Sequence, residues 1–150
     1  MRKYNKIFIS HQNVNDEKIK ELADQLEENG CEVMISNLEK QLPELSDEEI
    51  TYEQIDECEA LLVLIGKGPN DNICVEKEIE EADRQDKIVV GIYMGGDEKS
   101  IPKSLENIGE GLIIYDIKKI LSVLDGNPCP WEDNRGFPRQ PINKVDKRDC

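Results

Sequence analysis

The stretch LLVLIG, residues 61–66, decides how the chain is expected to fold. A run of apolar residues leaves neither face of a strand polar, which is typical of a central strand in a parallel sheet with helices on both sides. The turn residues KGPNDN follow at 67–72, and Val75, Ile79 and Ala82 then recur at helical spacing. A strand, a turn and a helix in this order form the repeating unit of an α/β fold.

Segments of the same two kinds alternate along the rest of the chain. We expect further strands at 6–10, 31–36, 87–94 and 111–116. We expect helices from Asn15 or Asp16 to the Asn29–Gly30 turn, from a Ser46 cap to about Cys58, at 73–85, in the short segment 100–108, and at 117–124. The pattern predicts an α/β domain with a parallel sheet. We assign residues 1–126 to this one domain, and residues 127–150, which hold four prolines, to a C-terminal tail that is either docked or disordered.

The composition limits the partners and the location. A chain of 150 residues is long enough for one domain with its own core. The formal net charge of −14 at pH 7 argues against a nucleic-acid partner, because a phosphate backbone would be repelled. The longest apolar run, at 60–66, is too short to cross a membrane, and the beginning of the chain lacks the apolar core of a signal peptide. Five cysteines without a C-x-x-C pair fit a reduced protein, so we expect a cytoplasmic location.

Several common kinds of site are not supported by the sequence. No G-x-G-x-x-G follows the first expected strand, and no G-x-x-x-x-G-K-[ST] occurs, so neither common nucleotide-phosphate loop is indicated. The single histidine, His11, argues against most zinc sites and most Ser-His-Asp arrangements. We therefore expect no metal, and we expect any chemistry to rest on a carboxylate.

The helix expected at 73–85 contains the most promising acid. Val75 and Ile79 must face the sheet, and Glu78 lies one position before Ile79, about 100° round the helix axis. Glu78 is thus expected to be half-buried at the rim of a cleft at the carboxyl ends of the strands, where open α/β sheets bind ligands. Partial desolvation would raise its pKa, against the opposing effect of the positive end of the helix. The remaining acids of this helix, Glu76, Glu80, Glu81 and Asp83, are expected to form a solvated face, and Glu78 could belong to that face as well.

Four segments together resemble TIR domains: KIFISH at 6–11, LPELSDEEI at 42–50, IDECEALLVLIG at 55–66 and CVEKEI at 74–79. They resemble most closely the small bacterial TIR-like proteins of the Thoeris antiphage type, and the resemblance covers roughly 6–125. It implies a flavodoxin-like fold, a three-layer sandwich with a five-stranded parallel sheet in the order 2-1-3-4-5.

The resemblance also implies an activity. Enzymes of this family cleave NAD at the nicotinamide N-glycosidic bond, with one glutamate four positions after an aromatic residue on the helix that follows the third strand. Glu78 matches that glutamate as the catalytic residue, and Cys74 stands at the aromatic position, where the resemblance implies a contact with the substrate. By position, Ser10, His11 and Gln12 would bind the nicotinamide or adenine-nucleotide side of the substrate, and Asn37 would bind the second ribose. NAD is then a substrate, and no cofactor is implied.

The expected product is an ADP-ribose-type signal, linear or cyclic, made by an NAD glycohydrolase or ADP-ribosyl cyclase for a separate effector protein. Members of the family usually need assembly to complete their site, so we expect self-association through the TIR-like domain. Two other functions stay open. A TIR module that only binds a protein partner is favoured by the missing aromatic residue at Cys74, and a nucleoside deoxyribosyltransferase-like enzyme would share both the fold and a glutamate carried on a helix.

Overall fold

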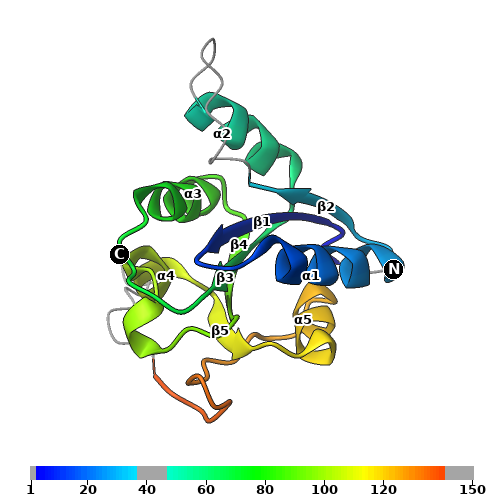
Figure 1. The fold of residues 1–150 in the computed structure, drawn as a ribbon. Helices are drawn as coiled ribbons and strands as arrows, with labels where there is room; N and C mark the ends of the chain where they lie inside the picture. Colours follow the sequence, from blue (N-terminus) through cyan, green and yellow to red (C-terminus); the bar gives the residue numbers. More distant parts are fainter. Residues whose placement is uncertain (1–2, 37–46, 141–150) are drawn as a thin grey trace, which may run out of the picture.

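The computed structural model describes residues 3–36 and 47–140, with side chains of residues 47–51 left aside. Its strands are β1 (Lys6–Gln12), β2 (Glu32–Ile35), β3 (Ala60–Ile65), β4 (Ile88–Tyr93) and β5 (Gly111–Ile114). Its helices are α1 (Asp16–Glu28), α2 (Asp47–Glu57), α3 (Ile73–Arg84), α4 (Lys103–Ile108) and α5 (Ile117–Leu124), with a short 3-10 helix η1 (Glu98–Ser100) (Figure 1).

The five strands form one parallel sheet in the order β2-β1-β3-β4-β5, so the predicted flavodoxin-like α/β fold is confirmed. Strand order reverses at β1, which has β2 on one side and β3 on the other. Ligands of such sheets bind outside the carboxyl ends of the strands near this reversal.

Helices cover both faces of the sheet. Figure 1 shows α1 and α5 on one side, with α2, α3 and α4 on the other. Along β1, Ile7 and Ile9 contribute to the core under α1 and α5, whereas Phe8 contributes to the core under α2, α3 and α4. Every residue of β3 is buried, as its apolar sequence predicts for a central strand.

The first strand is longer than predicted. We expected it to end at Ser10, but its pairing with β3 continues to Gln12 opposite Ile65. The polar side chains of His11 and Gln12 suggested a loop, but hydrogen bonding to the apolar partner strand keeps them in the sheet. These two residues therefore lie inside β1 rather than after it.

The predicted helix caps hold where the structure describes them. Asn15 caps α1, its side chain accepting a hydrogen bond from the backbone N–H of Lys18 at 2.9 Å. Gly30 follows α1 with a φ of 89°, the left-handed conformation that a glycine adopts without strain. The predicted cap at Ser46 lies outside the described residues. Within residues 3–36 and 47–140, we find no helix with the length and apolar character that crossing a membrane requires.

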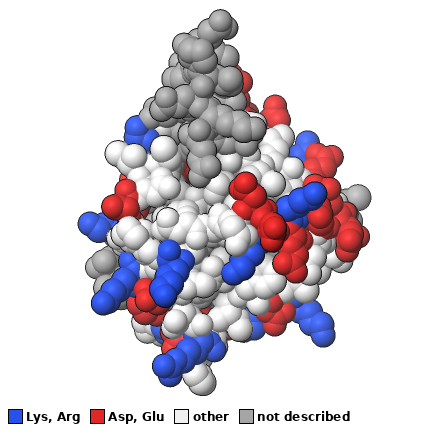
Figure 2. All heavy atoms as spheres, viewed as in Figure 1, with Lys and Arg blue, Asp and Glu red and all other residues white. Residues whose placement is uncertain are grey.

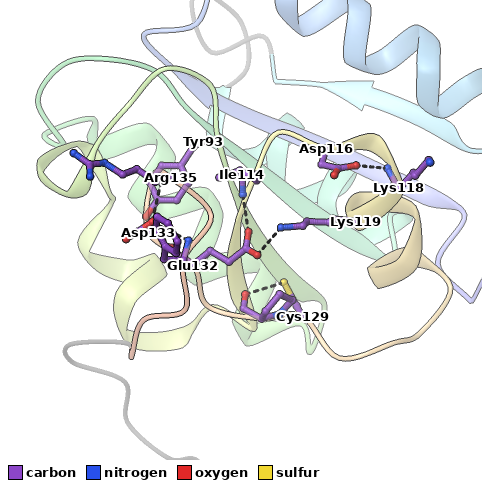
Figure 3. Close-up of polar contacts among 11 residues, drawn as sticks. Tyr93, Ile114, Asp116, Lys118, Lys119, Cys129, Glu132, Asp133 and Arg135 are labelled. Atoms are coloured by element: carbon purple, nitrogen blue, oxygen red, sulfur yellow. Dashed lines mark hydrogen bonds and ion pairs between the residues drawn. The ribbon is translucent and has the colours of Figure 1, made fainter.

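Part of the tail packs against the free edge of β5. The backbone N–H of Leu112 donates to Pro130 O at 3.0 Å, and that of Glu132 donates to Leu112 O at 2.7 Å. Figure 3 shows the buried Glu132 carboxylate between the backbone N–H of Ile114, at 3.1 Å, and the Lys119 ammonium group, at 2.6 Å. This segment satisfies backbone groups of an edge strand that would otherwise be open to another strand. The boundary between domain and tail at residue 126 stays a prediction.

The loops after β1 and β3 are in close contact where the strand order reverses. Gly66 follows β3, and its backbone N–H donates to Gln12 O at 2.9 Å. A Cβ atom on Gly66 would lie 1.9 Å from the backbone oxygen of Asn13, so no side chain fits there without moving the backbone.

We expect Gly66→Ala to lower the free energy of unfolding by about 3 kcal/mol, because the added methyl group meets fixed backbone rather than a flexible side chain. Gly30→Ala is the matched control: a Cβ atom there meets nothing within 4 Å, so only the left-handed backbone is strained, at about 1 kcal/mol. Urea unfolding of both variants measures the difference. An equal loss in the free energy of unfolding of the two variants would contradict a close contact between the loops after β1 and β3.

Candidate functional site

Glu78 lies in the second turn of α3, the helix that follows the central strand β3. Asn72 caps this helix, and its side chain accepts hydrogen bonds from the backbone N–H groups of Cys74, at 3.0 Å, and Val75, at 3.2 Å. Val75 and Ile79 are packed against the sheet at 1% and 0% exposure. Glu78, next to Ile79, is only 1% exposed, so the expectation of a half-buried acid was wrong: the carboxyl group is buried.

The two oxygens of the Glu78 carboxyl group are held by hydroxyl groups from two different strands. Ser10 Oγ on β1 donates to Oε1, and Ser36 Oγ, just after β2, donates to Oε2, each at 2.6 Å. Ile9 pairs with Ile35 in the sheet, so the next residues along both strands, Ser10 and Ser36, reach the same level at its carboxyl end. The carboxyl group thus joins α3 to β1 and to the end of β2.

Burial has a clear effect on the ionisation of Glu78. Removal from water raises the pKa of its carboxyl group from 4.5 to about 7, although the hydrogen bonds from Ser10 and Ser36 favour the ionised form and act in the opposite direction. Near neutral pH both protonation states are therefore populated. A buried acid with its pKa near the working pH is a frequent property of functional sites.

Two other acids of α3 also have specific partners, contrary to the expected solvated face. The Glu76 carboxylate accepts the backbone N–H groups of Lys103, at 2.8 Å, and Ser104, at 2.9 Å, which ties α3 to the start of α4. Glu81 is buried and pairs with Arg84, which lowers the pKa of Glu81. The prediction failed because helical spacing identifies the face towards the sheet but not the flanks that neighbouring helices cover. Glu80 is exposed as expected.

The helix α1 presents a solvated acidic face. Its sequence DEKIKELADQLEE places Asp16, Glu17, Glu21 and Asp24 in exposed positions. Figure 2, which has the same view as Figure 1, shows acidic side chains gathered where α1 lies in Figure 1. The acidic face of α1 thus lies on the opposite side of the sheet from Glu78.

A family model described as the TIR domain matches residues 7–120. The chain belongs to the TIR domain family. The resemblance drawn from the sequence is therefore confirmed at the level of the family, and the closer kinship with Thoeris-type proteins stays a prediction.

Two solved structures are similar to this TIR domain. One is the activated Roq1 resistosome directly recognizing the pathogen effector XopQ (TIR domains), with 18% identity, a TM-score of 0.46, and coverage of 59% of this chain and 57% of that chain. This chain thus spans less than two thirds of the Roq1 chain. The other is a diflavin flavoprotein A3 from Nostoc sp., with 12% identity, a TM-score of 0.44, and coverage of 95% and 78% respectively. None of the curated proteins matches the chain.

Two other predicted site residues of the TIR domain, His11 and Cys74, lie in or contact the segments that hold Glu78. His11 Nε2 lies 3.2 Å from the backbone oxygen of Ser36, so it contacts the same segment that holds Glu78. Cys74 is partly exposed, one turn before Glu78 on α3. Asn37 lies outside the described residues.

Gln12 contacts the last residue of η1 rather than Glu78. It is 2% exposed, and its Nε2 donates to the backbone oxygen of Ser100 at 2.5 Å. Its Oε1 has no hydrogen-bond partner among residues 3–36 and 47–140. Substrate contacts of Ser10, His11, Gln12, Asn37 and Cys74 stay predictions.

Sequence reasoning missed Ser36. A hydroxyl residue at the end of the second expected strand was available as a signal, but its meaning depends on which strand lies next to it. In the part of the chain that the structure describes, no group of three or more His, Cys, Asp or Glu residues is arranged to hold a metal ion.

The raised pKa of Glu78 predicts a specific pH dependence of stability. Between pH 4.5 and about 7 the folded protein binds more protons at Glu78 than the unfolded chain does, so the free energy of unfolding falls as pH rises through this range and then levels off. Glu78→Gln cannot ionise and lacks this loss. We expect the free energy of unfolding of the variant, relative to that of the native protein, to rise by up to about 3 kcal/mol between about pH 5 and about pH 8.

Urea unfolding at both pH values measures this gain, and Glu80→Gln, on the exposed side of the same helix, is the matched control. Parallel pH dependence of the native protein and Glu78→Gln would contradict a raised pKa.

Proposed function

We propose that this TIR domain is an enzyme that cleaves NAD at the nicotinamide N-glycosidic bond, with Glu78 as its catalytic residue. The observation that supports this most is the buried Glu78 carboxyl group, held through both oxygens at the carboxyl end of β1 and β2. Membership of the TIR domain family, which includes NAD-cleaving enzymes, supports the same reaction.

The chemistry suits a single acid in a poorly hydrated position. The bond between C1′ of the ribose and the nicotinamide nitrogen breaks, and its electron pair goes to that nitrogen, which loses its positive charge. The sugar passes through an oxocarbenium-like state, and the leaving group is neutral, so no general acid is needed. A carboxylate next to the developing positive charge stabilises it more strongly in a low-dielectric site than in water.

A nucleophile then captures C1′ of the ribose. If water attacks, the product is linear ADP-ribose and one proton is released. If a nitrogen of the adenine ring attacks, the product is a cyclised ADP-ribose. We propose that either product acts as a signal for a separate effector protein in antiphage defence, as the resemblance to Thoeris-type proteins implies, and that self-association through the TIR domain accompanies activation.

A second function is favoured by a specific observation. Both oxygens of Glu78 already accept hydrogen bonds within the protein, and Cys74 stands where the resembled enzymes have an aromatic side chain. Both features fit a TIR domain that only binds a protein partner and in which Glu78 has a structural role.

The two functions differ in what Glu78→Gln does. If the domain is an enzyme, we expect the variant to release nicotinamide from NAD at least about a hundredfold more slowly, because the charge that stabilises the transition state is lost. Glu80→Gln, exposed on the same helix, should keep the native rate. Mass spectrometry of the products, with and without phage lysate, measures both.

Unchanged turnover in Glu78→Gln would exclude Glu78 as the catalytic residue. No turnover by the native protein under either condition would leave the binding module as the better explanation.

The ionisation of Glu78 also predicts the pH profile of the enzyme. Because the carboxylate is the active form, we expect kcat/KM to rise with pH, with a midpoint near the free-protein pKa of about 7, and then to level off. The midpoint of kcat should be lower, because the positively charged nicotinamide ring of bound NAD favours the carboxylate. A rate that falls above neutral pH would instead indicate that the protonated acid is the active form.

A further inference from the structure

Glu78 is buried and hydrogen-bonded through both oxygens, which limits how a substrate could reach it. Oε1 accepts a hydrogen bond from Ser10 and Oε2 accepts one from Ser36, and the residue is 1% exposed. Each oxygen has a second acceptor position, but at this exposure a ribose hydroxyl has no open path to it. A group that covers the carboxyl oxygens must therefore move, and the two serines differ in how easily they can do so.

Ser10 is fixed in the middle of the sheet. It belongs to β1, which is paired with β2 on one side and β3 on the other, and it lies opposite Val63 in the β3 pairing. Its exposure is 0%. Its hydroxyl group is enclosed between the sheet and α3, so the bond to Oε1 belongs to the core.

Ser36 is held differently. It follows β2, which is an edge strand with β1 as its only sheet neighbour. Its backbone N–H donates to Ile9 O at 2.9 Å, and its backbone oxygen lies 3.2 Å from His11 Nε2, so its backbone is anchored. Among residues 3–36 and 47–140, the hydrogen bond of its side chain is the one to Oε2, and at 7% Ser36 is more exposed than Ser10. Rotation about the Cα–Cβ bond alone would release Oε2.

We propose that the Ser36 hydroxyl occupies the position of a substrate hydroxyl, and that a ribose hydroxyl of the bound nucleotide replaces it on Glu78 Oε2. This rests on the proposed function and deepens it. Both groups are alcohols that donate one hydrogen bond, so the exchange leaves no buried carboxylate oxygen without a partner. Ser10 keeps its bond to Oε1 in both states.

The exchange also has a consequence for specificity. A ribose offers adjacent hydroxyl groups on the ring, and a sugar that lacks the hydroxyl in question would leave Oε2 unpaired once Ser36 has turned away. Leaving a buried charged acceptor unpaired is costly. The site should therefore select ribonucleotides of the ADP-ribose class over their deoxy counterparts.

Equilibrium binding of ADP-ribose tests the exchange without any catalytic step. In Ser36→Ala the free protein has lost the internal partner of Oε2, and the ligand supplies the missing hydrogen bond. We expect ADP-ribose to bind about tenfold more tightly than to the native protein, since a hydrogen bond to a charged group is gained rather than exchanged. Ser36→Thr, which keeps a hydroxyl, should return to native affinity.

Ser10→Ala is the matched control, because it removes the other hydroxyl of the same carboxyl group. Oε1 then lacks its partner in the free and the bound protein alike, so no gain in affinity is expected. Ser36→Cys replaces Ser36→Ala in the test if the alanine variant folds poorly. Its thiol is similar in size but a poorer donor, so it should shift the affinity for ADP-ribose in the same direction. Isothermal titration calorimetry measures all five proteins, after thermal unfolding has shown that each one is folded.

The result separates this inference from the proposed function. Tighter binding by Ser36→Ala together with absent NAD cleavage would support the exchange and reject the enzyme. Glu78-dependent NAD cleavage with equal or weaker binding by Ser36→Ala would support the enzyme and overturn the exchange. Failure of every protein to bind ADP-ribose would overturn the exchange as well.

Discussion

The burial of one carboxyl group between α3 and the ends of two strands is the constraint on which the candidate site depends. Glu78 lies one position before Ile79, on the flank of α3 that faces the ends of β1 and β2, so its side chain is buried where the helix packs on the sheet. A buried carboxyl group needs partners for its oxygens, and Ser10 and Ser36 supply them. The parallel pairing of β1 with β2 brings the two serines to the same level, so sheet register and site geometry have a common origin.

The general fold was predictable because its strongest signals are local. The unbroken apolar run of β3 and the helical spacing of Val75, Ile79 and Ala82 identify a central strand and its following helix without tertiary information. The end of β1 was not predictable in the same way. His11 and Gln12 are polar, and their pairing with β3 keeps them in the strand.

The candidate site was predictable only in part. Helical geometry and family resemblance both singled out Glu78, but neither indicates what its carboxyl group contacts. Residues 10, 36 and 78 are far apart in sequence, and their contact depends on strand order and register together. Glu76 shows the same limit, since its partners come from the start of α4.

The chemical identity of residue 78 favours function over structure. A position that needed only hydrogen bonds with two serine hydroxyls could be filled by glutamine, whose oxygen accepts from one hydroxyl, whose NH2 group donates to the other, and which never ionises. Glutamate there lowers the stability of the folded protein at neutral pH, because its pKa is raised to about 7 by burial. Sites that must carry charge in a poorly hydrated place often reduce stability in this way, so the cost is what a catalytic carboxylate would be expected to show. The hydroxyl groups of Ser10 and Ser36 limit the cost, since they favour the ionised form that the proposed reaction requires.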